Sequence, residues 1–169
     1  KNTYLVSDQC PPQTIDILKT RAEPIGIKLK ITSVEKFKFT PSIFGVLIQC
    51  PDTRGTIKDY TSICNKAHKI GAFVCFATDL MALTLFKPPG EMGGDVAIGS
   101  SQRFGVPMGN GGPHAAFFST TNQFKRKIPG RIIGLTNDSK NNPALRMALQ
   151  TREQHIRREK ATSNICTDQ

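Results

Sequence analysis

The sequence of 169 residues lacks tryptophan, has only two tyrosines, and contains no long hydrophobic run. Its apolar stretch at residues 43–48 ends at Gln49, far short of the roughly 18 consecutive apolar residues that a membrane-spanning helix needs. With no tryptophan and only two tyrosines beside ten phenylalanines, the sequence shows no aromatic platform of the kind that stacks nucleic-acid bases. We therefore expect no membrane span and no nucleic-acid partner.

The sequence also lacks the spacings that mark metal and disulfide sites. Its five cysteines are odd in number and widely separated, and none forms a C-x-x-C pair. Neither His68 nor His114 has a second ligand at a metal-binding spacing, so no metal site is predicted. Cys75 lies in an apolar segment, where packing is a better explanation than catalysis. A reducing intracellular compartment fits this pattern best.

Acidic residues are scarce, and the positive charge is unevenly distributed. The chain has 23 Lys and Arg against 13 Asp and Glu, a net charge of +10, of which +7 falls in residues 103–169. A basic surface attracts an acidic protein, an anionic membrane or nucleic acid. A solvated helix face explains the charge equally well, and a basic nucleic-acid-binding module stays open as an alternative function.

Short apolar runs alternate with helical patterns, which indicates a mostly parallel α/β sheet. Strands are predicted at residues 1–6, 27–32, 43–49, 72–77, 95–99, 114–119 and 132–136, and helices at 13–22, 57–70 and 143–163. Residues 43–78 form a βαβ unit. The chain begins without Met and inside a predicted strand, so we interpret residues 1–169 as a single partial domain of a longer protein.

Polar residues follow two of the predicted strands. Asp79 follows residues 72–77, and Ser100, Ser101 and Gln102 follow residues 95–99. Ligands of open α/β sheets bind at the carboxyl ends of strands, and an Asp with a polar cluster 21 to 23 residues later is typical of a pyridoxal phosphate (PLP) site. An amide cannot replace the Schiff-base lysine. Equally, Asp79 could cap the following turn and Gln102 could bond a loop.

Two further segments were considered for binding. The glycine-rich turn at residues 105–113 matches neither nucleotide-binding glycine motif, so nucleotide binding is disfavoured. The predicted C-terminal helix is rich in basic residues, and a guanidinium can hold a carboxylate or phosphate with two hydrogen bonds. We predict an interface formed by Arg152, His155, Arg157 and Arg158.

Several motifs together resemble one enzyme family. They are Arg103-Phe104-Gly105-Val106-Pro107-Met108-Gly109, Gly111-Gly112-Pro113-His114-Ala115-Ala116-Phe117-Phe118, Pro129-Gly130-Arg131 and the run from Ala148 to Cys166. The sequence is similar to the N-terminal half of the glycine decarboxylase P-protein of the glycine cleavage system, and the similarity covers essentially the whole chain. Pro11 departs from the family pattern, so no role is assigned there.

The resemblance implies a fold and a division of labour. The fold is three-layer α/β with a mostly parallel sheet, the large domain of PLP-dependent enzymes of the aspartate aminotransferase fold. The Schiff-base lysine, and with it the PLP, is expected in the other half of the protein. Gln102 occupies the lysine position here, so this chain holds no catalytic residue. Asp79, Ser101 and Gln102 are then a vestigial cofactor site.

The resemblance also implies an activity for the whole enzyme. That activity is PLP-dependent decarboxylation of glycine, with transfer of the aminomethyl group to the lipoyl group of H-protein, an acidic partner. This segment, inactive alone, would support the active site of the C-terminal half or second subunit, in a homodimer or α2β2 assembly. The location would be the mitochondrial matrix in a eukaryote or the cytoplasm in a bacterium. A stand-alone regulatory pseudoenzyme is the alternative.

Overall fold

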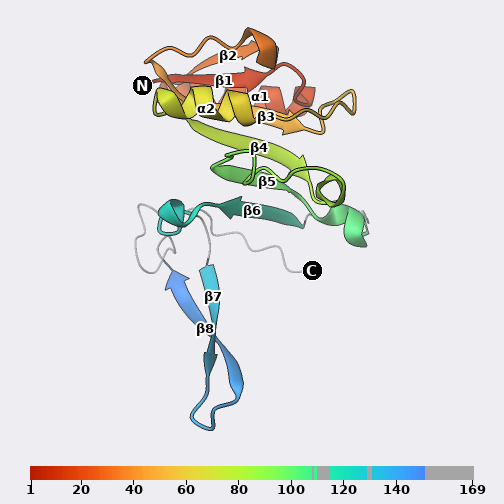
Figure 1. The fold of residues 1–169 in the computed structure, drawn as a ribbon, viewed down its shortest axis with the longest axis vertical. Helices are drawn as coiled ribbons and strands as arrows, with labels where there is room; N and C mark the ends of the chain where they lie inside the picture. Colours follow the sequence, from red (N-terminus) through yellow and green to blue (C-terminus); the bar gives the residue numbers. More distant parts are fainter. Residues whose placement is uncertain (108, 110–114, 129–130, 151–169) are drawn as a thin grey trace. The chain divides into compact units, whose positions relative to one another are not determined.

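The computed structural model describes residues 1–107, 109, 115–128 and 131–150. The chain divides into two compact units, Lys1–Thr120 and Thr121–Gln169. Each unit is described by itself below, and both are drawn in Figure 1. The interpretation of residues 1–169 as one partial domain stays a prediction.

The first unit is built on one sheet. Its strands are β1 (Thr3–Ser7), β2 (Lys28–Thr32), β3 (Ile43–Cys50), β4 (Phe73–Asp79), β5 (Val96–Ser100) and β6 (Ala116–Thr120). They are ordered β2-β1-β3-β4-β5-β6, as Figure 1 shows from top to bottom. All neighbours pair in parallel except β5 and β6, which pair antiparallel. The predicted mostly parallel sheet is therefore confirmed.

Two helices make the crossover connections. Helix α1 (Pro12–Ala22) joins β1 to β2 and begins with a proline, which has no backbone N–H to leave unbonded. Helix α2 (Thr61–Lys69) joins β3 to β4 and buries Cys64 and Ala67. The helix ends at Lys69, and Gly71 follows its cap with a φ of 63°, the left-handed conformation that glycine adopts easily. The N–H of Gly71 donates to the carbonyl of His68. Short 3₁₀ turns lie at Glu23–Ile25, Val34–Lys36, Ala82–Thr84 and Gln102–Phe104.

Apolar clusters cover both faces of this sheet. On one face, Val74 and Phe76 are fully buried in a cluster that includes residues of α2. On the other, Val6 and Leu47 are buried in a cluster against which α1 packs. The continuous apolar run of β3 is explained by this two-sided burial. The unit has three layers, helix, sheet and helix, as predicted. No helix in the described part of the chain is long and apolar enough to cross a membrane.

The second unit contains a hairpin where a helix was predicted. The unit begins with a short 3₁₀ turn at Asn122–Phe124. Strand β7 (Arg131–Asn137) follows and pairs antiparallel with β8 (Pro143–Gln150). The prediction of a helix at 143–163 is wrong for residues 143–150, and its remainder lies outside the described residues. Ala, Leu, Arg and Met favour helix in isolation, but pairing with β7 overrides that weak preference.

The predicted helix at 57–70 is shorter in the structure. It begins at Thr61, because residues 52–60 form a loop that is fixed by Asp52. Oδ1 of Asp52 accepts hydrogen bonds from the backbone N–H groups of Arg54 and Thr56, at 2.9 and 2.8 Å. Side chains of this type compete with helix by bonding nearby backbone.

Candidate functional site

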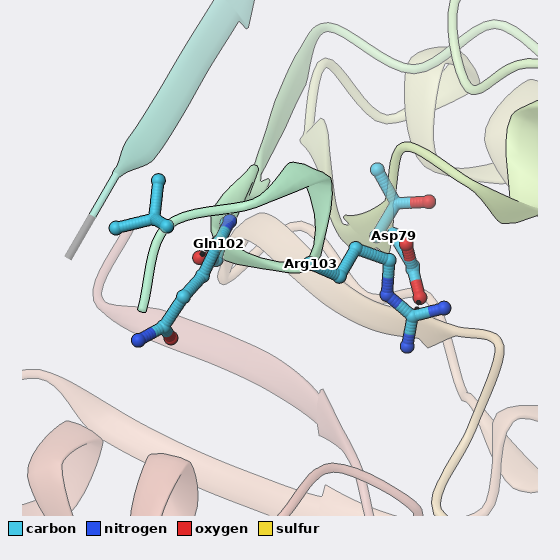
Figure 2. Close-up of a pocket in the computed structure, with 6 residues that line it drawn as sticks. Asp79, Gln102 and Arg103 are labelled. Atoms are coloured by element: carbon cyan, nitrogen blue, oxygen red, sulfur yellow. Dashed lines mark hydrogen bonds and ion pairs between the residues drawn. The ribbon is translucent and has the colours of Figure 1, made fainter. Parts of the chain in front are cut away.

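The carboxyl ends of β4 and β5 form a pocket. The parallel register places Asp79 opposite Ser100, so the loops that follow the two strands start side by side. The pocket has a volume of about 460 Å³ (Figure 2). It is lined by Thr78, Asp79, Ser100, Gln102, Arg103 and Val106. This is the sheet edge at which open α/β proteins bind ligands.

Both carboxylate oxygens of Asp79 have a partner. Oδ1 accepts a hydrogen bond of 2.9 Å from the backbone N–H of Met81, so Asp79 caps the following turn, as one of the two interpretations of the sequence predicted. Oδ2 lies 2.9 Å from Nη2 of Arg103. The Asp79 side chain is 26 % exposed, so this ion pair is less screened than a fully exposed one. Asp79 thus already has a positively charged partner within the chain.

The loop after β5 is held in place by its own hydrogen bonds. The N–H and the hydroxyl of Ser101 both donate to the carbonyl of Ala115, at 2.7 and 2.8 Å. The backbone N–H of Gln102 donates to Oγ of Ser100 at 3.1 Å, and its carbonyl accepts from Val106 at 3.0 Å. These bonds fix the backbone from which Arg103 extends.

The structure brings together some of the residues predicted from sequence. Asp79 and Gln102 line one pocket, whereas Ser101 uses its hydroxyl on the backbone of Ala115. Arg152, His155, Arg157 and Arg158 lie outside the described residues. Sequence reasoning missed the role of Arg103, a basic residue that directly follows Gln102 and that Figure 2 shows extending toward Asp79.

The lining residues do not fit covalently bound PLP. The six described lining residues include no lysine, so none carries the amine that a Schiff base requires. PLP enzymes place a carboxylate against the pyridine nitrogen, but Asp79 is engaged by Arg103. No step of PLP chemistry can therefore be assigned to this pocket.

A second, smaller pocket lies where the strand order reverses, between β1 and β3. It has a volume of about 210 Å³ and is lined by residues from the ends of β1, β2 and β3, among them Ser7, Glu35, Asp52 and Tyr60. Tyr60 is 5 % exposed, and burial raises its pKa to about 12, with smaller contributions from Cys50, Asp52 and Glu35. A neutral phenol at this site can serve only as a hydrogen-bonding group near neutral pH.

The described thiols are not activated nucleophiles. Cys10, Cys50, Cys64 and Cys75 are free, and burial is the main cause that raises the pKa of each. The pKa of Cys75 rises to about 12, far from the depressed values of reactive cysteines. Among the described residues, no group of three or more His, Cys, Asp or Glu side chains could hold a metal ion.

Comparisons with known proteins show the family of this chain. The family model of the glycine cleavage system P-protein matches residues 1–169. The chain is 58 % identical over 166 residues to the mitochondrial glycine dehydrogenase (decarboxylating) of Dictyostelium discoideum. It is 57 % identical over 168 residues to the glycine dehydrogenase (decarboxylating) of Nostoc punctiforme. These alignments cover 98 % and 99 % of the chain, which spans only 17 % of the length of either relative.

Solved structures show the same relationship. A glycine decarboxylase (P-protein) of the glycine cleavage system, in inhibitor-bound form, superposes with a TM-score of 0.86 at 35 % identity, over 99 % of this chain and 39 % of that one. Cystathionine gamma-lyase from Lactobacillus plantarum superposes over 75 % of this chain and 34 % of its own, with a TM-score of 0.60 at 13 % identity, which shows the shared fold alone. The predicted fold class is confirmed, and the chain belongs to the glycine cleavage system P-protein family.

Proposed function

We propose that this chain is a segment of a glycine dehydrogenase (decarboxylating). The whole protein would release carbon dioxide from glycine and transfer the aminomethyl group to the lipoyl group of H-protein. Support comes from the family match over residues 1–169 and from relatives of which the chain spans 17 %. The activity belongs to the whole protein, and the segment alone is expected to be inactive.

Within that protein, the segment is part of the non-catalytic half. The observation that carries this assignment is the pocket at the ends of β4 and β5, where Gln102 stands in place of a lysine and Asp79 is paired with Arg103. PLP, bound in the other half, would supply the electron sink for decarboxylation. The residues of this chain would shape and support that active site from outside it.

Uncovered apolar surface supports the idea that this segment packs against the rest of the protein. In the β7–β8 hairpin, the cross-strand pairs Ile133–Met147 and Leu135–Leu145 put four side chains on one face. Their exposed fractions are 54, 48, 83 and 72 %, in that order. An isolated two-stranded hairpin is only marginally stable, so this face needs a covering surface. The other half of the P-protein, or a second subunit, is the partner we assign to it.

The net charge of +10 agrees with the proposed acidic partner. The described part of the second unit carries six basic residues, Lys125, Arg126, Lys127, Arg131, Lys140 and Arg146, against the single acid Asp138. A field of this sign speeds the association of an acidic H-protein. The relative from Dictyostelium discoideum is named as mitochondrial, so we assign the matrix if the source is a eukaryote and the cytoplasm if it is a bacterium.

The proposal is tested by isotope exchange. The whole protein, mixed with lipoylated H-protein and glycine, should exchange labelled bicarbonate into the glycine carboxyl group. A version that lacks residues 1–169 should lose this exchange, because the active site loses its supporting segment. Equal exchange with and without residues 1–169 would refute the supporting role, and no exchange by the intact protein would refute the activity.

A further inference from the structure

The described residues that line the pocket at the ends of β4 and β5 include no lysine, and the pocket differs from a PLP site in a second way. A pyridinium N–H is held by an anionic carboxylate that faces it, and a second cation on the same carboxylate competes with the ring nitrogen. At Asp79, Oδ1 is bonded to the N–H of Met81 and Oδ2 is paired with Nη2 of Arg103, each at 2.9 Å. The positive guanidinium would also repel a positive ring nitrogen.

We propose that the Arg103–Asp79 ion pair closes this pocket to PLP independently of the missing lysine, so that the coenzyme is directed to the other half. The inference rests on the proposed function for the idea that a PLP site exists elsewhere in the protein. Arg103 is then a specificity-determining residue, which keeps a second coenzyme out.

The local structure suits Arg103 to this role. It lies in the 3₁₀ turn Gln102–Phe104, whose backbone is fixed to Ser100 and Ser101 by hydrogen bonds. Because Asp79 and Ser100 are register partners, a side chain three residues after Ser100 starts beside the end of β4. In Figure 2 the guanidinium reaches the Asp79 carboxylate, whereas the Gln102 amide points away from both.

The ion pair and the missing lysine can be separated by substitution in the whole protein. Gln102→Lys restores an amine but leaves the ion pair. Gln102→Lys with Arg103→Ala restores the amine and frees Asp79, and Gln102→Lys with Arg103→Gln does the same while keeping a long side chain in the turn. Gln102→Lys with Arg54→Ala is the matched control, because Arg54 is exposed and lines the other pocket.

Each protein is incubated with PLP at a concentration that leaves position 102 of the Gln102→Lys variant only partly labelled, and is then reduced with borohydride. The labelled peptide that contains position 102 is quantified by mass spectrometry. In both Arg103 double variants the Asp79 carboxylate can accept a charge-assisted hydrogen bond from the pyridinium N–H. Labelling at position 102 should therefore rise about tenfold or more. The Gln102→Lys variant and the Arg54 control should stay equally low. Circular dichroism identifies a variant that fails to fold. If one Arg103 double variant fails, the labelling of the other is compared with that of Gln102→Lys.

Two results would overturn the inference. Gln102→Lys labelled as fully as the double variants would show that the ion pair excludes nothing. Double variants labelled no more than Gln102→Lys would show that another feature closes the pocket. Failure of the proposed function has a different signature, since the wild-type protein would then carry no reducible PLP outside residues 1–169.

Discussion

Nε2 of His68 lies 2.9 Å from Oδ2 of Asp95, and the same oxygen accepts the backbone N–H of Val74 at 2.8 Å. Asp95 is 7 % exposed, and its own N–H donates to the carbonyl of Val74 at 2.9 Å. Its carbonyl accepts the hydroxyl of Thr120 at 2.8 Å. One residue therefore ties α2, β4 and the end of β6 together beside the start of β5.

Asp95→Ala should destabilise the protein. The substitution leaves the buried N–H of Val74 without its side-chain acceptor, which costs about 1–3 kcal/mol of unfolding free energy. Urea unfolding measures the loss. Asp16→Ala is the control, because Asp16 is 71 % exposed and its surface pair with Lys19 is worth about 0.5 kcal/mol or less. Equal effects of the two substitutions would contradict the role assigned to Asp95.

Gly45→Ala should also be destabilising. A Cβ at position 45 would lie 2.6 Å from Cε2 of Tyr4, a ring held by stacking on Phe44 and burial in the sheet. The ring must shift, which costs about 1–3 kcal/mol. Gly90→Ala serves as the control, because no atom lies within 4 Å of its added Cβ. Thermal unfolding of both variants should show the loss at position 45 only.

Stability should fall at alkaline pH. Burial raises the pKa of Cys10 and Cys64 to about 11, and that of Cys75 to about 12, from 9.0. Above pH 9.0 the unfolded thiols lose their protons while the folded ones keep them, so the free energy of unfolding falls as the pH rises toward these values. Below pH 9.0 the thiols are protonated in both states, so their burial contributes fully to the free energy of unfolding.

The expected slope is about 1.4 kcal/mol per pH unit for each thiol that stays protonated only in the folded state. Cys75→Ala should therefore make the decline between about pH 9 and 11 shallower by up to that amount. Urea unfolding across this pH range, in the presence of a reductant, gives the slope directly. A slope unchanged by Cys75→Ala would mean that burial does not protect this thiol.

The turn of the hairpin depends on a residue with positive φ. Asn141 has a φ of 64°, and the turn is closed by Asp138, which accepts backbone N–H groups from Lys140 and Asn142. Asn141→Gly should be tolerated, whereas Asn141→Val should cost about 1–2 kcal/mol, because a β-branched side chain is strained there. Hydrogen exchange of the β7 and β8 amides should speed up in the Val variant and not in the Gly variant.

Buried strands were the part of the fold that sequence predicted best. Residues 43–48 and 72–77 are continuously apolar, and both lie in central strands covered on two faces. The failure at residues 143–150 has a physical cause, since its residues favour helix locally and only the pairing with β7 makes them a strand. The alternation of Leu145, Met147 and Leu149 with smaller or charged residues was the available signal.

The candidate site was predicted only in part. Asp79 and Gln102 could be placed together because parallel strands end at one edge of a sheet. The ion pair between Asp79 and Arg103 could not be predicted from the sequence, because it depends on the register of β4 with β5 and on the direction of a long side chain. A basic residue directly after Gln102 is visible in the sequence, but its partner is fixed only by the fold.

The central claim is that this chain carries no covalent PLP and that the coenzyme lies in the other half of the protein. Borohydride reduction of the intact wild-type protein, followed by peptide mapping of the labelled lysine, tests it most directly. We predict a single labelled lysine outside residues 1–169. A stoichiometric label on any lysine within residues 1–169 would contradict the account.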